Sequence, residues 1–145
     1  MAQSTRTDTG LLLLRLIVGF IFLFHGAGKL FGWWGGYGIE GTAGFFEGLG
    51  IPFPVASVVL AGATEFFGGL LLMAGLGVRL VAAPLAITML VASFSAHAGA
   101  FNSSAGGMEY PLLLACSAAA LGLLGPGRFR LASNKSATRE LVPAG

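Results

Sequence analysis

Long apolar runs, separated by short polar or glycine-rich stretches, set the hydrophobic pattern of this chain. Four such runs predict membrane-crossing helices at residues 11–30, 55–76, 80–97 and 108–124. The first two reach about 20 residues, the length that spans the hydrocarbon core of a bilayer, and the other two are shorter. None of the runs alternates strictly between apolar and polar positions, as a half-buried strand does. We therefore expect an all-α integral membrane protein, a four-helix bundle in which residues 1–145 form a single domain.

The composition excludes a soluble class of protein. Only 10% of the residues are charged, 55% are hydrophobic, and the mean hydropathy is +0.84. Soluble domains carry about 25% charged residues. The 24 glycines suit helices that approach one another closely in lipid. The net charge of +2 is small, and no basic cluster is dense enough to bind nucleic acid. The expected partner is the lipid bilayer.

The distribution of charge predicts the orientation of the bundle. With four spans, both termini lie on the same side of the membrane. That side holds most of the cationic residues, namely Arg6, Arg15, Arg79, Arg128, Arg130, Lys135 and Arg139. The other side holds one cation, Lys29, together with Glu40, Glu47 and Glu109. Because cytoplasmic loops are enriched in Lys and Arg, we expect both termini in the cytoplasm.

The connections between the spans differ in length and chemistry. Residues 75–79 predict a tight cytoplasmic turn, whereas residues 31–54 predict a long external loop rich in glycine and aromatic residues. The tryptophans of this loop are typical of residues that anchor a protein at the membrane–water interface. Within the loop, residues 42–49 predict a short helix lying in that interface. We expect residues 126–145 to be a flexible cytoplasmic tail.

Glu65 lies near the middle of the second apolar run, where an unpaired charge is costly. The first run carries three candidate partners, Arg15, His25 and Lys29, which share an arc of about 80° on a helix that turns by 100° per residue. Glycines flank this arc and the Glu65 side of the second helix, so both faces permit close approach. Because the long Arg15 side chain can reach the depth of Glu65, we expect these two residues to form an ion pair, directly or through water.

Two interpretations of this polar set stay open. An ion pair of Glu65 with Arg15 or His25 either fixes the register of the helices or takes part in a reaction, since ionisable residues inside a membrane are candidates for function. Lys29 lies close enough to the end of its span for its side chain to extend to the interface, which would explain it without a functional role.

Two further polar residues bracket the last external loop. His97 ends the third run and Glu109 begins the fourth, so we expect them to form an outer polar cluster at the level of Lys29. With two histidines in the chain and no group at metal-ligand spacing, the sequence predicts no metal site and argues against haem. Cys116 is the single cysteine, which excludes an internal disulfide, and its apolar surroundings favour a packing role.

Several short motifs occur in a fixed order along residues 12–124. They are Arg15-Leu16, residues 24–30 with the sequence FHGAGKL, residues 46–54 with FEGLGIPFP, residues 62–65 with GATE followed by Gly68, Gly69 and Leu72, and residues 77–79 with GVR. In this order and spacing they resemble the DoxX family of small four-helix bacterial membrane proteins. The family pattern matches at Arg15, Gly26, Lys29, Gly50, Pro52 and Glu65. It constrains the last two helices less, so it adds little support for a role of His97 or Glu109.

The resemblance implies a component of a redox system in the bacterial inner membrane. Related proteins include the membrane subunit of a thiosulfate:quinone oxidoreductase, and members are often linked to redox or thiol-stress systems. We therefore expect a function linked to a quinone or to thiol and sulfur chemistry. Soluble redox enzymes are candidate partners, and assembly with further copies of the chain stays open.

A quinone inside the bundle needs a hydrogen-bond donor and a proton source beside an apolar slot. His25 and Lys29 are the candidate donors and Glu65 is the candidate proton relay, so these three form the candidate catalytic set. The aromatic residues that could line the slot are Phe22, Phe66 and Phe67. Two other classes of function remain. One is a non-catalytic scaffold that docks soluble enzymes through the arginine-rich tail, and the other is a small-molecule transporter whose polar residues line a pathway.

Overall fold

Five α-helices build the part of the chain that the structure, a computed structural model, describes, which comprises residues 2–131. They are α1 (Ala2–Phe31), α2 (Gly38–Gly48), α3 (Pro54–Ala74), α4 (Val78–Ser95) and α5 (Glu109–Leu124), and the connections contain two short 3-10 helices, η1 (Trp33–Gly35) and η2 (Ser103–Ala105). No strand occurs within these residues. The predicted all-α fold is confirmed, and the short helix predicted at residues 42–49 is α2, which begins earlier, at Gly38.

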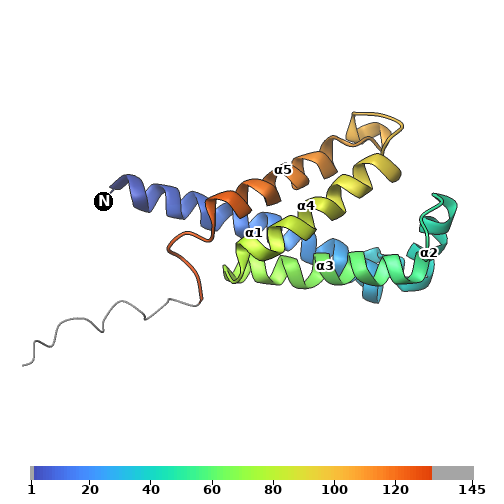
Figure 1. Cartoon of the computed structure of the whole chain (residues 1–145), viewed down its shortest axis with the longest axis horizontal. Coiled ribbons are helices and arrows are strands. Elements are labelled where there is room, and N and C mark those ends of the chain that lie inside the picture. Colours follow the sequence, from blue (N-terminus) through green and yellow to red (C-terminus); the bar gives the residue numbers. More distant parts are fainter. Residues whose placement is uncertain (1, 132–145) are drawn as a thin grey trace, which may run out of the picture.

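The four longer helices are arranged as two antiparallel pairs (Figure 1). α1 packs along α3 and α4 packs along α5, while the contacts between the two pairs are sparser. A turn of residues 75–77 joins α3 to α4 and brings the pairs together at one end, whereas the pairs diverge toward the end where α2 lies. We call these the turn end and the α2 end.

The turn between α3 and α4 is short because glycines stop one helix and start the next. Gly75 has a φ of 73°, and the N–H of Leu76 donates to the carbonyl of Leu71 at 2.9 Å, which closes the last turn of α3. Gly77, with a φ of 55°, then precedes α4. Residues with a side chain rarely adopt these left-handed angles. The tight turn predicted at residues 75–79 is confirmed.

Glycines bring the backbones of α1 and α3 into contact. A Cβ atom added at Gly26 would lie 2.4 Å from the backbone nitrogen of Phe66 and 2.7 Å from the carbonyl oxygen of Gly62. At a second crossing point, a Cβ atom added at Gly69 would lie 2.5 Å from the carbonyl oxygen of Gly19. The sequence predicted small inward faces on both helices, and these contacts confirm that prediction.

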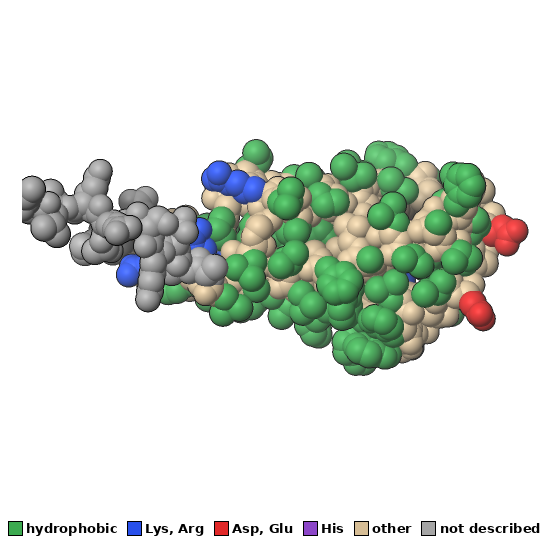
Figure 2. All heavy atoms as spheres, turned by 60° about the horizontal axis from the view of Figure 1, so that its bottom comes forward, with side chains coloured by type: hydrophobic (Ala, Val, Ile, Leu, Met, Phe, Trp, Pro, Cys, Tyr) green, Lys and Arg blue, Asp and Glu red, His purple; other side chains and the backbone are tan. Residues whose placement is uncertain are grey.

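Apolar side chains fill the bundle toward the turn end. The buried cluster there joins Val18 and Leu72 of the first pair to Leu85 and Leu121 of the second, and none of these is more than 4% exposed. Figure 2 shows that apolar side chains also cover the flank of the bundle, with cationic side chains at one end and acidic ones at the other. A flank of this kind fits the hydrocarbon core of a membrane, where charged groups are costly.

Three helices, α1 from Ser4 onward, α3 and α4, are long and apolar enough to cross a membrane. α5 is apolar but has only 16 residues. At 1.5 Å per residue it measures about 24 Å, which is less than the roughly 30 Å of the hydrocarbon core. The chain is thus a membrane-embedded helical bundle, and the crossing by a fourth helix stays a prediction. α1 extends beyond the predicted residues 11–30, because the polar residues 2–10 form its first turns.

Candidate functional site

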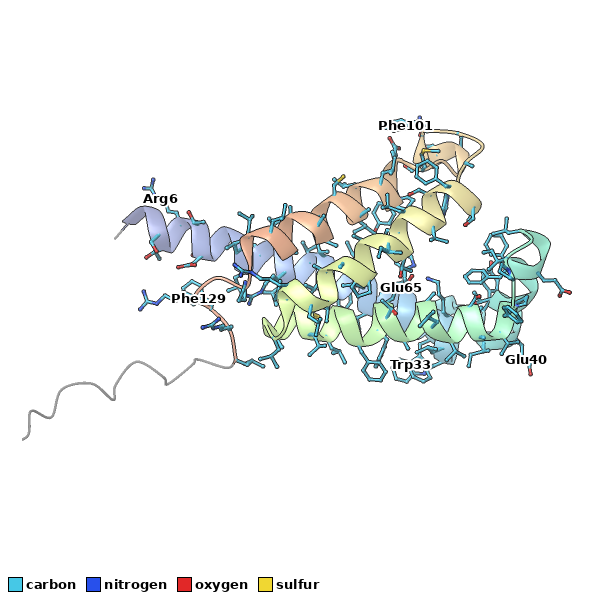
Figure 3. The ribbon with its side chains drawn as sticks, viewed as in Figure 1. Arg6, Trp33, Glu40, Glu65, Phe101 and Phe129 are labelled. Carbon is cyan, nitrogen blue, oxygen red and sulfur yellow. The ribbon has the colours of Figure 1, made fainter. Side chains whose placement is uncertain are left out.

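The structure pairs Glu65, the charge in the middle of the bundle, with a lysine. The Nζ of Lys29 lies 2.6 Å from the Oε2 of Glu65. The Glu65 side chain is only 1% exposed and that of Lys29 is 23% exposed. α1 supplies the lysine near its last turn, and α3 supplies the glutamate, which lies between the two helix pairs (Figure 3). The intramembrane carboxylate therefore has the opposite charge that its position requires.

The direction of helical side chains explains this pairing. Side chains on an α-helix lean toward its N-terminus. Because α1 and α3 are antiparallel, Lys29 leans from the α2 end into the bundle, and Glu65 leans from the middle of the bundle toward the α2 end. Gly62 leaves room for the lysine stem, since a Cβ atom added there would lie 3.3 Å from the Cβ of Lys29. The two charged groups meet for this reason.

The ion pair expected between Arg15 and Glu65 is not formed. Arg15 is 1% exposed, and its guanidinium donates to the carbonyl oxygens of Pro126 and Phe129. By the same rule of direction, the Arg15 side chain leans toward the N-terminus of α1, away from Glu65 and toward the turn end. The prediction used the depths of the two residues and the small faces around them, but not the direction of their side chains. Whether the ion pair of Glu65 fixes the register of the helices or takes part in a reaction, its partner is Lys29.

Residues 125–131, which we call the strap, cross the turn end of the bundle. Besides the two bonds from Arg15, the N–H of Arg128 donates to the Oδ1 of Asp8 at 3.0 Å, and the N–H of Leu131 donates to the carbonyl of Ala74 at 3.1 Å. The flexible tail predicted for residues 126–145 is thus tied to the bundle as far as residue 131, and its remainder lies outside the described residues. Both described ends of the chain lie at the turn end (Figure 1).

Arg15→Met is expected to release the strap. The substitution keeps a long apolar side chain but removes both hydrogen bonds. We expect the free energy of unfolding to fall by only about 1–2 kcal/mol, since the loss of a buried charge offsets part of the loss of the bonds. The Nε of Arg15 indeed has no partner among the described residues. Limited trypsin digestion in detergent micelles measures the release, because cleavage after Arg128 should become faster. Arg6→Met is the control, and equal cleavage rates in the two variants would contradict the role of Arg15.

A cavity of about 730 Å³ lies in the half of the bundle nearest the α2 end. Its wall takes residues from all five helices and from η1, and both Lys29 and Glu65 belong to it. Glu65 is the wall residue of α3 nearest the turn end, so the ion pair lies at the inner end of the cavity. Apolar side chains such as Phe22, Met89 and Leu114 form much of the remaining wall.

The other predicted polar residues divide between the cavity and the surface. His25 and His97 line the cavity, whereas Glu109 does not. The Nδ1 of His97 lies 2.8 Å from the carbonyl oxygen of Gly106 and must carry a proton in that contact, because a carbonyl only accepts. The Oε1 of Glu109 accepts from the N–H and the Oγ of Ser103, both at 2.6 Å. His97 and Glu109 therefore both bond within the connection between α4 and α5, and the outer cluster that they were expected to form stays a prediction.

Of the three phenylalanines expected in an apolar slot, one lines the cavity. Phe22 is part of the wall, and Phe66 and Phe67 are not. Phe66 packs edge-on against Phe31, with ring centroids 5.4 Å apart, and Phe67 is 58% exposed on the flank of the bundle.

Sequence reasoning missed that hydroxyl side chains line the wall, which are those of Tyr37, Thr42, Ser57, Thr88, Ser95 and Tyr110. Thr88 and Ser95 lie two turns apart on one face of α4, and this spacing inside an apolar run was the available signal. Their hydroxyls donate to the carbonyls of Pro84 and Val91, at 2.8 and 2.7 Å. Each hydroxyl oxygen therefore keeps lone pairs that can accept a hydrogen bond.

The wall combines an ammonium, a carboxylate and imidazoles around an apolar interior. Lys29 has three N–H donors, of which Glu65 accepts one, so donors remain for a ligand. Within residues 2–131 no group of three or more His, Cys, Asp or Glu could hold a metal ion. The arrangement can hold a small, mostly apolar molecule with an acceptor at Lys29, and it can exchange a proton with that molecule.

Comparisons with known proteins identify the relatives of this chain. A family model described as DoxX matches residues 10–98. A curated protein of Bacillus subtilis (strain 168), named "Putative oxidoreductase CatD", is 36% identical over 107 residues, which cover 74% of each chain. No solved structure matches the chain significantly. The range that matches the family includes Arg15, His25, Lys29, Glu65 and His97, and it ends before Glu109.

Proposed function

The chain belongs to the DoxX family, and from that premise we propose that it is a membrane component of a redox system and binds a quinone in its cavity. The observation that carries the proposal is the Lys29–Glu65 ion pair in the wall of a cavity of about 730 Å³. The name of the Bacillus subtilis relative, which contains the word oxidoreductase, supports the redox class.

The wall supplies what a quinone headgroup requires. The quinone carbonyl accepts a hydrogen bond from the free donors of Lys29, and the ring packs against apolar neighbours such as Phe22 and Met89. Clefts that bind small molecules measure about 300–1,000 Å³ and combine apolar walls with a few polar groups. This cavity has that size and that composition.

The protons and electrons of the proposed reaction have separate sources. Reduction of a quinone to a hydroquinone takes up two electrons and two protons. Glu65 and His25 are the proposed proton relays, which take up a proton from water and pass it to the quinone, and Lys29 holds the carbonyl oxygen that receives it. A soluble redox enzyme, or a cofactor bound with it, supplies the electrons.

His25→Phe is expected to weaken the binding of a short-chain quinone by about 1–2 kcal/mol, or roughly 5–30-fold in Kd, because it removes a hydrogen-bonding partner and keeps a ring of similar size. Equilibrium dialysis of the purified protein in micelles against the quinone measures this change. Phe20→Leu alters a ring of α1 that is 47% exposed and absent from the wall, so it should leave Kd unchanged. The proposal fails if the wild-type protein binds no quinone or if both variants bind it equally well.

The charges of the two ends support an orientation in the inner membrane. The turn end carries Arg79 and the strap, with Arg128 and Arg130, whereas α2 carries the exposed Glu40 and Glu47. Since cationic residues concentrate on the cytoplasmic side, we place the turn end in the cytoplasm. The cavity then lies in the outer half of the membrane.

A scaffold that docks soluble enzymes is the second candidate function. It is favoured by the strap, because the bonds from Arg15 hold Arg128 and Arg130 in place at the turn end instead of leaving them on a mobile tail. The two functions are compatible, since an enzyme that docks at the strap could deliver electrons to the bundle.

A further inference from the structure

The wall of the cavity is mostly apolar but carries several polar groups. Hydroxyl side chains from several helices, two imidazoles and the ion pair all belong to its wall. A dry cavity would leave the spare donors of Lys29 and the hydroxyl lone pairs without partners, whereas a roomy cavity with several polar groups holds water. The 23% exposure of Lys29 points the same way, because an ammonium exposed to lipid is costly and one exposed to water is not.

The wall residues show to which side this water connects. On the four long helices they lie at residues 22–29, 57–65, 87–95 and 110–114, all in the half nearest the α2 end. The wall continues into α2 and to His97 in the connection that follows α4. These segments lie at the surface of the α2 end.

Toward the turn end, apolar side chains fill the space between the helix pairs, and the pocket of about 230 Å³ that Leu14, Cys116 and Leu121 line there shares no residue with the cavity. The buried cluster of Val18, Leu72, Leu85 and Leu121 lies between the wall residues and the turn end. Beyond it the guanidinium of Arg15 is bonded to the strap. Side chains packed at the density of a protein interior leave no continuous path for water.

We propose that the cavity is a water-filled vestibule that connects the Lys29–Glu65 pair with the aqueous phase on the α2 side of the membrane and is closed toward the turn end. Protons and polar ligands therefore reach the pair from the α2 side. The proposal rests on the proposed function only for the identity of the ligand, since the vestibule would be open in the same way without a quinone.

Single cysteines and a charged thiosulfonate reagent test the vestibule. In a background with Cys116→Ser, Ser95→Cys lies in the wall near the α2 end and Ala61→Cys lies in the wall one turn from Glu65. Ser93→Cys is the matched control, because Ser93 is on the same helix as Ser95 but 0% exposed and absent from the wall. The reagent is added to right-side-out and to inverted membrane vesicles. Glu47→Cys on α2 and Arg128→Cys on the strap report which side each preparation exposes.

Ser95→Cys and Ala61→Cys should react from the side that labels Glu47→Cys, at least about tenfold faster than Ser93→Cys, because only a thiol in contact with water forms the reactive thiolate. Reaction of Ala61→Cys from both sides would indicate a pore, and reaction from the Arg128→Cys side alone would reverse the direction of access. No reaction of Ala61→Cys while Glu47→Cys reacts would indicate a dry cavity. Each of these three results overturns the proposal. Labelling as expected in a protein that binds no quinone would instead leave the vestibule standing and remove the proposed function.

Discussion

Replacing Lys29 by methionine is expected to lower the free energy of unfolding by about 3–5 kcal/mol, because it leaves the carboxylate of Glu65, only 1% exposed, without its opposite charge. Methionine is close to lysine in length and is flexible, so the loss reports the charge more than the packing. Glu65→Met should cost less, since the stranded ammonium of Lys29 is already 23% exposed and can turn into the cavity. Titration with a denaturing detergent, followed by far-UV circular dichroism, measures each loss.

The double variant identifies the pair. Lys29→Met combined with Glu65→Met should cost clearly less than the sum of the single losses, since apolar side chains of similar volume often replace a buried ion pair at little cost. Arg15→Met combined with Glu65→Met is the matched cycle, and we expect its losses to add, because Arg15 bonds to the strap instead. Additive losses for Lys29 and Glu65, with coupling between Arg15 and Glu65, would reverse the pairing seen in the structure.

Gly26→Ala is expected to destabilise the bundle by about 3 kcal/mol, the upper part of the range for overpacked interiors. The new methyl group would lie 2.4 Å from the backbone nitrogen of Phe66 and 2.7 Å from the carbonyl oxygen of Gly62. Both are backbone atoms, so α1 and α3 must move apart as whole helices to admit it. Such a shift would also separate Lys29 from Glu65, so the same variant should bind a quinone less tightly.

Gly10→Ala is the control on the same helix. A Cβ atom added at Gly10 meets nothing within 4 Å. Alanine should there stabilise the helix by about 0.5–1 kcal/mol, through its lower conformational entropy in the unfolded chain. The two substitutions are chemically identical and should have opposite signs. A stabilising effect of Gly26→Ala would mean that the two backbones do not touch.

The helices and their small faces could be predicted from the sequence because both depend on local pattern. Apolar runs of sufficient length define α1, α3 and α4, and the turn glycines at residues 75 and 77 follow from the composition of the link between two such runs. The spacing of Gly19 and Gly26 on α1 already places them on one face. These features need no knowledge of how the helix pairs are oriented.

The ion pair was assigned wrongly because residue position was used without side-chain direction. By depth along the helix, Arg15 and Lys29 are both plausible partners for Glu65. The lean of side chains toward the N-terminus separates the two, since it carries Arg15 to the turn end and Lys29 to the middle of the bundle. The strap that receives Arg15 could not be foreseen, because its contacts with α1 join residues more than a hundred positions apart.

The cavity itself could not be predicted from periodicity. A helical pattern tells which face of α4 is polar, but not that α4 and α5 diverge from α1 and α3 toward the α2 end (Figure 1). Because of that divergence, hydroxyl side chains such as those of Thr88 and Ser95 line a cavity instead of packing against the neighbouring helices.

The tryptophans of this chain occupy an unusual place. Trp33 and Trp34 are the two tryptophans of the sequence, they are neighbours, and both belong to the wall of the cavity. Trp34 is also stacked on the ring of Phe24, with centroids 5.1 Å apart. All indole fluorescence of the protein therefore arises beside the cavity, so the native emission spectrum is an intrinsic optical probe of whatever occupies it, and the protein needs no added dye.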